Sequence, residues 1–600
     1  MTRSCSFPKP TAILRHVLRV LIPVSIALTI YLYLYPVFGT CAFPLPPSSS
    51  SEPLSPFLET AKAHWPPSFL ANATALVTNS SVEEPPSPAL PSKKAPFRLL
   101  TLGDPQLEGS TSIPIEYLGV FPHAKSLVRN FKLSRHGVKQ ALHDVVDILL
   151  EDTFNFLESV RKIIDLFGND FYLAHIYRSV HWWTRPTHVT VLGDLVGSQW
   201  LNEAEFTKRA SRYWNRVFRG AEKVPDGLQA YPAEEYDLTG YLSRFDNDTT
   251  WARRIINVAG NHDIGYAGDI TTNLTARFEK AFGKINYELR FELPLPEGFD
   301  SKALYDPDTN TESTRLVPEL RLVVLNDMNL DTPALSTQLQ DDTYTFINNV
   351  INTAAAVEFE GHYTVILTHI PLYKPTGVCV DQPFFEFHSH DGTLKEQNQL
   401  SVAASKGFLE GILGMSSSSS APGGGKGRRG IILNGHDHAG CDTYHFVNQT
   451  AEGGEVEWQV KRWRQAVREK TVGKETEGVP GVREITVRSM MGDFGGNAGL
   501  LSVWFDEETW QWKAEYDTCP LGTQHLWWLV HILDLIAAVG VVVYVVCGVL
   551  KVVGLDVDRL FWGSNKTGGT TNKKGSSGPA EKVTAATTST GKAQAQRKSG

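Results

Sequence analysis

Cysteine is scarce in this chain of 600 residues: it occurs only six times, and never in the C-x-x-C spacing that thiolate metal sites use. A thiolate-bound metal is therefore not expected. The chain also has no basic patch with interleaved aromatic residues, and its net charge is -8, so general nucleic-acid binding is not predicted. A composition of 42% hydrophobic and 20% charged residues is typical of one large globular domain or two.

Apolar runs long enough to cross a bilayer occur twice, at about Val20–Phe38 and Leu526–Leu550. Basic residues precede the first run, and residues 551–600 hold nine Lys/Arg against three Asp/Glu. The positive-inside rule therefore predicts that residues 1–19 and the basic, disordered tail 551–600 are both cytosolic. A cleaved signal peptide is the alternative for the first run, but the run is long and Gly39-Thr40-Cys41 is a poor cleavage site.

The segment between the two runs is then predicted to lie in a lumen. It contains N-glycosylation sequons at Asn72, Asn79, Asn247, Asn273 and Asn448. Four of the cysteines (Cys41, Cys379, Cys441 and Cys519) also fall there, where disulfides persist. Within the second run, His531 and Asp534 are either functional or packed on the first run near the headgroups.

Composition divides the luminal part further. Residues 39–96 are rich in Pro and Ser and predict a flexible stalk, and residues 97–515 predict the folded domain. A Ser/Gly/Pro tract near residues 415–428 predicts a disordered insert. Residues 137–167 have helical apolar periodicity; because acids such as Asp144 and Asp152 disfavour a membrane surface, we expect this helix to pack against the domain.

Within the domain, short apolar strands alternate with helical segments, which predicts an α/β fold. The predicted strands comprise residues 97–102, 188–192, 254–259, 321–326, 363–368, 430–434, 485–487 and 501–505. Five of these strands run directly into polar residues. The candidates are Asp104 with Gln106, Asp194, Asn261 with His262 and Asp263, His369, and His436 with His438.

These side chains offer only oxygen and imidazole ligands, a set that suits Mn, Fe or Zn. In an extended segment, residues i and i+2 face the same way, so Asp104 and Gln106 form one pair and His436 and His438 another. Asp194 could bridge two cations that clamp an attacking hydroxide and a phosphoryl oxygen. His262 could then protonate a leaving oxygen. Taken one at a time, each motif is more often a turn or a packed histidine; together, in this order, they predict a site.

The same residues resemble the calcineurin-like metallophosphoesterase superfamily, whose first motif takes His or Gln at the position of Gln106. The resemblance implies a β-sandwich flanked by helices and a dinuclear metal centre. It places Asp104, Gln106, Asp194 and His438 on one metal and Asp194, Asn261, His369 and His436 on the other. It also implies that His262 is the catalytic histidine and that Asp263 orients it.

Longer motifs around the same residues resemble those of one membrane-bound subgroup of this superfamily. They are Asn261–Gly265, His369–Tyr373 and Gly435–His438 followed by Cys441. Members of this subgroup act in the early secretory pathway and use Mn. They remove ethanolamine phosphate from a mannose of the GPI-anchor glycan. The resemblance therefore implies GPI-anchored proteins as partners and the endoplasmic reticulum, or else the Golgi, as the location.

Two further predictions concern the loops and the tail. Cys379 and Cys441 follow motifs that should converge, so we expect a disulfide between them. Arg597-Lys598 near the C-terminus is either a dibasic retrieval signal, which would engage coat or cargo-receptor proteins, or a generic basic tail.

Two other functions stay open. One is a phosphomonoesterase or phospholipid-headgroup esterase on the same site, since substrate choice would lie in loops such as 374–400. The other is a cargo adaptor for GPI-anchored proteins, although a binding module has no need of His262 beside a complete set of metal ligands.

Overall fold

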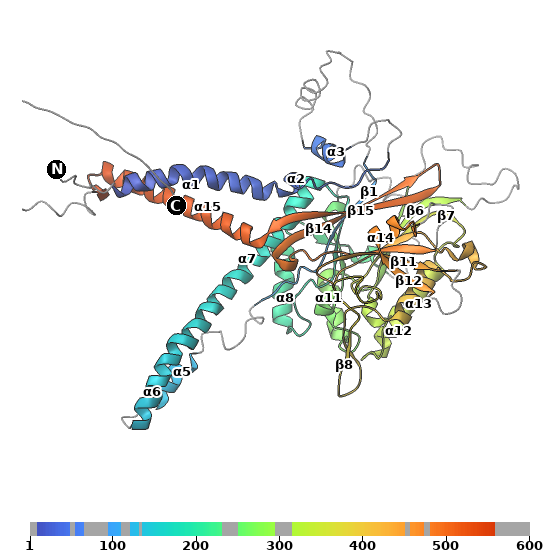
Figure 1. The fold of residues 1–600 in the computed structure, drawn as a ribbon, viewed down its shortest axis with the longest axis horizontal. Helices are drawn as coiled ribbons and strands as arrows, with labels where there is room; N and C mark the ends of the chain where they lie inside the picture. The colour runs from blue at the N-terminus through green and yellow to red at the C-terminus, as the bar shows by residue number, and fades with distance from the viewer. Residues whose placement is uncertain are drawn as a thin grey trace, which may run out of the picture. The chain divides into compact units, whose positions relative to one another are not determined.

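The computed structural model describes residues 9–47, 55–64, 94–109, 121–130, 135–230, 250–293, 315–449, 457–472 and 480–558. The chain divides into two units, one made of Met1–Pro23 with Leu535–Gly600 and the other of Val24–Asp534. The second unit contains the predicted domain, and it is built on two β-sheets (Figure 1).

The first sheet has six strands in the order β15-β14-β1-β2-β4-β3. They are β1 (Phe97–Leu102), β2 (His188–Leu192), β3 (Glu222–Lys223), β4 (Arg254–Val258), β14 (Gly495–Asp506) and β15 (Gln511–Thr523). Strand β2 runs parallel to both β1 and β4 at the centre, while β14 is antiparallel to β1 and to β15. The parallel strands therefore present their carboxyl ends at one edge.

The second sheet has seven strands in the order β12-β11-β13-β10-β7-β6-β5. They are β5 (Tyr287–Glu292), β6 (Arg315–Val324), β7 (Glu360–Leu367), β10 (Gly430–Asn434), β11 (Cys441–Val447), β12 (Trp458–Arg462) and β13 (Gly481–Thr486). Here β6, β7, β10 and β13 are parallel in turn. A separate hairpin joins β8 (Phe385–Phe387) to β9 (Leu394–Gln397).

Alternation along the strands explains how the sheets pack. On β1, Phe97 and Leu99 enter one buried cluster together with Leu322 of β6 and Val365 of β7, so this cluster is shared by both sheets. Leu100 and Leu102 face the opposite way, into a second cluster that includes helical residues. A strand buried on both faces reads as a nearly continuous apolar run. The predicted α/β fold is thus confirmed as two mixed sheets flanked by helices.

Helices cover the outer faces of the sheets. They are α8 (Glu203–Arg212), α11 (Thr272–Phe282), α12 (Thr337–Asn352), α13 (Val402–Leu413) and the last part of α7 (Thr153–Thr184). Their caps follow the usual chemistry: Asn202, Thr271, Ser336 and Ser401 each accept a hydrogen bond from the backbone three residues on.

The prediction that residues 137–167 pack against the domain is wrong for most of that segment. It forms α6 (Arg135–Asp147), a π-helical turn (Ile148–Asp152) and the start of α7, beside α5 (Pro122–Asn130). Leu142, Leu149 and Phe154 are each at least 64% exposed. The acids that argued against a membrane, Asp144 and Asp152, are buried and accept hydrogen bonds within this group of helices, so they do not cover its apolar face.

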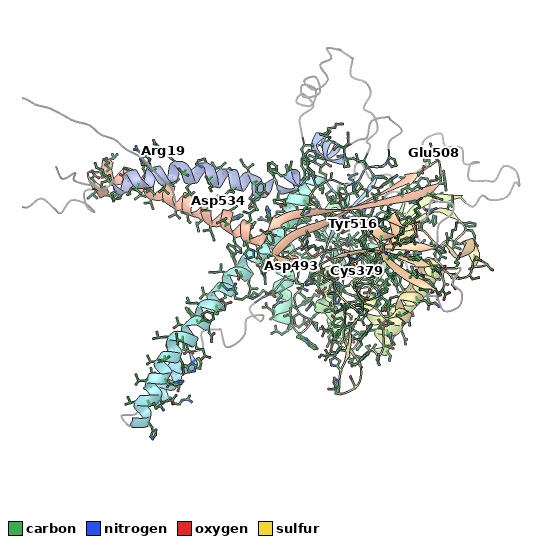
Figure 2. All side chains as sticks on the ribbon, in the orientation of Figure 1. Arg19, Cys379, Asp493, Glu508, Tyr516 and Asp534 are labelled. Atoms are coloured by element: carbon green, nitrogen blue, oxygen red, sulfur yellow. A yellow bond between two sulfur atoms is a disulfide. The ribbon has the colours of Figure 1, made fainter. Side chains whose placement is uncertain are left out.

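The described part of the predicted stalk is folded, also contrary to expectation. Cys41, Ala42 and Phe43 are buried, and a short helix, α3 (Pro56–Lys62), follows. Cys41 forms a disulfide with Cys519 of β15, a pairing that the sequence reasoning did not make. The predicted disulfide Cys379–Cys441 is confirmed, and Cys379 is marked in Figure 2.

The tract at 415–428 is ordered rather than disordered. Ser416 N donates to Gly425 O, and the Gln449 amide nitrogen donates to the carbonyls of Ser416 and Gly424. Several of its glycines have positive φ, including Gly425 at 70° and Gly427 at 76°. Glycine therefore serves here to fold a compact loop, whereas the composition alone reads as low complexity.

Both predicted membrane runs form long apolar helices, α1 (Pro10–Tyr33) and α15 (Gln524–Val552), with mean hydropathies of 1.8 and 2.6. The first helix ends earlier than predicted, because Pro36 begins a separate turn, α2 (Tyr35–Phe38). In the second unit, Asp534 of α15 (Figure 2) accepts hydrogen bonds from Ser25 and Thr29 of α1. Packing of Asp534 on the first helix, one of the two alternatives, is thus confirmed.

The first unit has its own contacts. The Thr11 backbone N–H donates to Asp558 Oδ1 over 3.0 Å, and its hydroxyl donates to Oδ2 over 2.6 Å. A Cβ at Gly540 would lie 2.8 Å from Leu18, so the helices approach closely there. The tail from 559 onward, with Arg597 and Lys598, and the sequons at Asn72, Asn79 and Asn247 lie outside the described residues.

Replacing Cys519 with Ala should lower the free energy of unfolding by about 2–5 kcal/mol, because the Cys41–Cys519 bond closes a loop spanning 478 positions in sequence. The measurement is thermal unfolding of the full chain in detergent. Cys547, a free cysteine in α15, supplies the control as Cys547→Ala, which should leave the midpoint unchanged. An equal midpoint in wild type and Cys519→Ala would contradict the stapling role.

Candidate metal centre

Seven of the predicted site residues come together at the carboxyl ends of five strands. Asp104 and Gln106 follow β1, Asp194 follows β2, Asn261 follows β4, His369 follows β7, and His436 and His438 follow β10. A chain of contacts of 3.3 Å or less links them all. This is the expected place for a ligand site in a sheet with parallel strands.

Two carboxylates and one imidazole form the most compact part of this group. Ligand atoms of Asp104, Asp194 and His369 all lie within 4.8 Å of one another, and all three side chains are buried. Burial and the neighbouring Asp194 raise the pKa of Asp104 well above its usual value. Asp104 Oδ2 is buried without a hydrogen-bond partner. A buried, unpartnered carboxylate oxygen beside a second carboxylate fits a cation, so this group could hold a metal ion.

The histidine nitrogens that face the site lack protons. His369 Nδ1 lies 2.8 Å from the carbonyl of Leu192, and His436 Nε2 lies 3.0 Å from that of Gln397. Each of these nitrogens must donate, which leaves a lone pair on His369 Nε2 and on His436 Nδ1. Burial lowers the pKa of both imidazoles, that of His436 to about 3, so both are neutral.

Those two lone pairs converge on another acceptor. Asn261 Oδ1 lies 2.9 Å from His369 Nε2 and 3.1 Å from His436 Nδ1. Asp194 Oδ1 lies 3.3 Å from His369 Nε2. With both tautomers set by backbone carbonyls and the Asn261 amide oriented with Oδ1 toward the two rings, no hydrogen lies between these atoms. Acceptors this close without a proton repel one another unless a cation stands between them.

Gln106 and His438 complete the other side of the group. The Gln106 amide nitrogen lies 3.0 Å from Asp194 Oδ2 and 3.2 Å from His438 Nε2. Turning this amide by 180° would bring its oxygen to the same place. The two residues thus add an amide and an imidazole beside the Asp104–Asp194 pair.

Backbone conformation at the site is unusual for residues that carry a side chain. Asp104, Gln106, Asp194 and His436 all have positive φ, at 43°, 41°, 51° and 70°. Such conformations cost about 1–3 kcal/mol each and concentrate at functional sites. Sharp turns directly after the strands aim several ligand-type side chains at one point.

Two glycines make room for this convergence. At Gly193, where φ is 92°, an added Cβ would lie 2.1 Å from His369 Nδ1. At Gly260 it would lie 2.2 Å from both the backbone nitrogen and Oδ1 of Asp194. Gly260 has φ −107°, so space, rather than the left-handed conformation, requires glycine there.

His262 lies at the rim of the group. Its side chain is 38% exposed, its Nε2 is 3.7 Å from Asp194 Oδ2, and its backbone N–H donates to Asp194 Oδ1 over 2.9 Å. Its Nδ1 is buried without a hydrogen-bond partner. The imidazole is therefore placed beside the carboxylates but remains reachable from solvent.

Asp263 makes its described contacts with the backbone, so the orienting role toward His262 that the resemblance implies stays a prediction. Its carboxylate accepts hydrogen bonds from the backbone N–H groups of Gly260, Leu195 and Val196, at 2.9, 3.1 and 2.9 Å. Burial, with Asp194 nearby, raises its pKa to about 8. Asp263 thus ties the β2 and β4 loops together.

Sequence reasoning missed two further carboxylates that position the site. Asp327, three residues beyond the end of β6, accepts hydrogen bonds from the backbone N–H groups of His369 and Ile370. Its place after an apolar strand is the same signal that identified the other residues. Glu484 accepts hydrogen bonds from Leu372 N and the Asn434 amide. It sits in the middle of β13, where nothing in the sequence marks it.

Gly193→Ala should weaken divalent-metal binding by about 10- to 100-fold, because the new methyl group would displace the His369 imidazole. Isothermal titration of the full chain with Mn²⁺ measures this. Gly220→Ala is the matched control: Gly220 has φ 93°, but nothing lies within 4 Å of its added Cβ. Equal metal affinity in both variants would show that His369 does not bind the ion.

Glu484→Gln should destabilise the domain by about 3–5 kcal/mol, because it leaves Lys374 buried without its ion pair. Burial alone would raise the pKa of Glu484. Lys374 and His445 outweigh this effect and hold the pKa of Glu484 well below its usual value. This stability is present above the unfolded pKa of about 4.3 and is lost as the pH falls below it.

Urea unfolding at several pH values between 3 and 7 checks this. The difference between wild type and Glu484→Gln should shrink as the pH falls below about 4. Glu508→Gln, an exposed site, should match wild type throughout. A difference that stays constant with pH would refute the role assigned to the ionised carboxylate.

Comparison with known proteins gives two relatives, while no family model matches the chain. The chain is 32% identical over 411 residues to Protein TED1 of Saccharomyces cerevisiae, a match covering 62% of this chain and 75% of that protein. It is 25% identical over 383 residues to the uncharacterized protein C23A1.02c of Schizosaccharomyces pombe, covering 62% of this chain and 78% of the relative. The buried acidic and histidine group thus lies in a chain that belongs to the TED1 family.

Proposed function

We propose that this protein is a luminal, metal-dependent phosphodiesterase that removes ethanolamine phosphate from a mannose of the GPI-anchor glycan. The observation that carries the proposal is the convergence of unprotonated acceptors from Asp194, Asn261, His369 and His436. The resemblance of the motifs to the calcineurin-like superfamily supplies the reaction class. The two long apolar helices and the disulfides indicate a membrane protein of the secretory pathway, where such a substrate occurs.

The proposal assigns two divalent ions, most simply Mn, to the group. Asp104, Gln106, Asp194 and His438 would hold one, and Asp194, Asn261, His369 and His436 the other. When bound, the ions would supply positive charge to a phosphoryl oxygen and a more acidic water. Asp194 suits the shared position because its Oδ1 faces His369 while its Oδ2 faces Gln106.

The protein's own contribution to the reaction is proton delivery and positioning. Water adds to phosphorus, the bond from phosphorus to the mannose oxygen breaks, and His262 gives a proton to that oxygen as it leaves. His262 suits this role because it is held at the rim by its backbone bond to Asp194 and remains accessible. Ethanolamine phosphate and the mannose hydroxyl are the products.

The contacts near the membrane support an anchored enzyme in place of a cleaved signal peptide. Ser25 and Thr29 of the first helix bond to Asp534 of the second, and Cys41 is tied to Cys519. A substrate attached to lipid in the luminal leaflet would then lie close to the domain. We place the protein in the endoplasmic reticulum membrane, with the basic tail as the part that coat or cargo-receptor proteins would contact.

His262→Ala should reduce turnover by about 10²- to 10⁴-fold, and Asp194→Asn should abolish it, with the fold intact in both. The assay is release of phosphoethanolamine from a synthetic ethanolamine-phosphate–mannose diester by the full chain, with and without Mn²⁺. Matched controls are His143→Ala and Asp226→Asn, whose side chains are 72% and 73% exposed. Both controls should retain full activity.

Two results would count against the proposal. Unchanged turnover in His262→Ala would remove the assigned proton donor. No release from the diester by a metal-loaded protein that does hydrolyse a phosphomonoester or a phospholipid headgroup would move the activity to that substrate class.

A further inference from the structure

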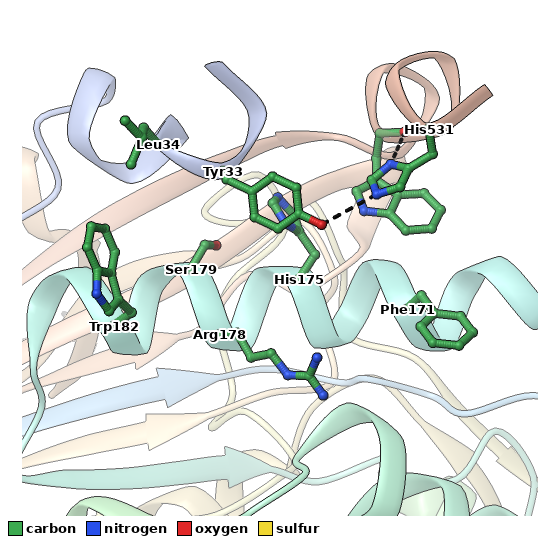
Figure 3. Close-up of a pocket in the computed structure, with 9 residues that line it drawn as sticks. Tyr33, Leu34, Phe171, His175, Arg178, Ser179, Trp182 and His531 are labelled. Carbon is green, nitrogen blue, oxygen red and sulfur yellow. Dashed lines mark hydrogen bonds between the residues drawn. The ribbon is translucent and has the colours of Figure 1, made fainter. Parts of the chain in front are cut away.

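A cavity of about 480 Å³ lies within the second unit, away from the strand ends that form the metal centre. Its walls come from the end of α1, the C-terminal half of α7 and the start of α15 (Figure 3). They are formed by Tyr33, Leu34, Phe171, His175, Arg178, Ser179, Trp182, Trp527 and His531. Most of this lining is aromatic or aliphatic, so the cavity favours an apolar occupant.

His175 is a polar residue of the cavity wall that lacks a hydrogen-bond partner, as does the Trp527 indole nitrogen. It is only 6% exposed, and neither of its ring nitrogens has a hydrogen-bond partner. The edge of its ring meets Tyr33, with centroids 4.9 Å apart. Burial, aided by nearby His531, lowers its pKa to about 4, so the ring is neutral and offers one N–H donor. Leaving that donor unmet costs about 1–3 kcal/mol, which an occupant with an acceptor oxygen would recover.

Two other polar groups of the cavity are engaged, whereas Trp527 Nε1 is buried without a hydrogen-bond partner. His531 Nδ1 donates to Trp527 O over 2.8 Å, and its Nε2 faces the Tyr33 hydroxyl at 3.5 Å. Arg178 donates to the carbonyl of Arg216, and its guanidinium extends on the opposite side of α7 from Tyr33 (Figure 3). The Arg178 guanidinium, the one formal cation among the lining residues, is thus turned away from Tyr33, an arrangement that does not favour a soluble phosphate as the occupant.

The cavity lies where the two candidate membrane helices join the domain. Tyr33 is the last residue of α1 and Leu34 follows it, while Trp527 lies in the first turn of α15, the position at which aromatic residues gather at membrane interfaces. Gly168 of α7 packs against Trp528 of α15, since an added Cβ would lie 1.9 Å from the Trp528 ring. Helix α7 therefore also reaches this junction. With these two helices across a bilayer, the cavity would lie at the depth of the lipid headgroups and ester linkages.

An apolar surface continues from the cavity along α7. Phe171 and Trp182 of the lining are 38% and 50% exposed, and Phe167, one turn before Phe171, is 59% exposed. Ile163, Ile164, Val160 and Leu157 are exposed further toward the start of the helix. A water-facing helix would not keep this series, whereas a lipid chain leaving the cavity would lie against it.

We propose that this cavity binds one diacyl lipid of the luminal leaflet. Its acyl chain lies against Phe171, Trp182 and Trp527, and an ester carbonyl accepts the hydrogen bond of His175. The site is separate from the metal centre, and the proposal does not depend on the reaction assigned there. Its consequence is that a bound lipid fills the junction between the domain and its two membrane helices.

The test uses the full chain in nanodiscs of diester phosphatidylcholine that contain a phosphatidylcholine with a diazirine in one acyl chain. After illumination, peptide mapping should find label in the segment that includes Phe171 to Trp182. Ser179→Trp, which fills the cavity, should reduce this labelling at least about fivefold. Val402→Ser changes an exposed apolar side chain of α13, outside both the cavity and the α7 surface, and should leave the labelling of this segment within about twofold of wild type.

A second measurement isolates His175. Unlabelled diester and diether phosphatidylcholines compete for the site, and the diester should compete several times better in wild type. His175→Phe keeps the ring but removes the donor, so the two lipids should then compete equally. Both disulfides and Mn²⁺ affinity are checked in each variant to show that the fold is retained. Labelling that survives Ser179→Trp, or equal competition in wild type, would overturn the proposal.

Discussion

The structure depends on one electrostatic constraint: hydrogen-bond acceptors are packed together with no proton between them. Two backbone carbonyls, of Leu192 and Gln397, fix the tautomers of His369 and His436 so that their lone pairs face Asn261. Beside them, Asp104 and Asp194 bring two buried carboxylates close together. A bare arrangement of this kind is repulsive, and a divalent cation turns the repulsion into coordination.

Much of the surrounding architecture serves this arrangement. Parallel strands in both sheets end at the same edge, the residues after them take left-handed conformations, and Gly193 and Gly260 leave space where a methyl group would collide. Asp263, Asp327 and Glu484 then hold the loops through backbone N–H groups. These carboxylates bind backbone N–H groups. Removing one of them would therefore shift the loops that carry the site residues.

The sequence predicted those parts of the fold that rest on local patterns. Apolar strands followed by polar residues located β1, β2, β4, β7 and β10 and the residues after them, because strand burial and strand ends are local properties. The ligand roles of those residues stay predictions. The pairing Cys379–Cys441 was accessible because both cysteines follow converging motifs, whereas Cys41–Cys519 joins opposite ends of the domain and has no local signal.

Failures of prediction arose where a residue's partner is distant in sequence. In the sequence, Asp144 and Asp152 disfavour a membrane-facing surface on the helix predicted at residues 137–167. The structure buries both inside the α5–α7 group, so they do not cover its apolar side chains. Glu484 looks like an ordinary strand residue until Lys374 and His445 are seen beside it. The Ser/Gly/Pro tract reads as disordered because composition does not register the left-handed glycines that close it into a loop.

The central claim is that the acceptors at the strand ends hold two metal ions that share Asp194. Anomalous diffraction from crystals of the Mn²⁺-loaded protein tests this most directly. The account predicts two peaks about 3.5–4 Å apart on either side of Asp194, one near His438 and the other near His369 and His436. A map with no peak among these residues, or with manganese bound only elsewhere, would contradict it.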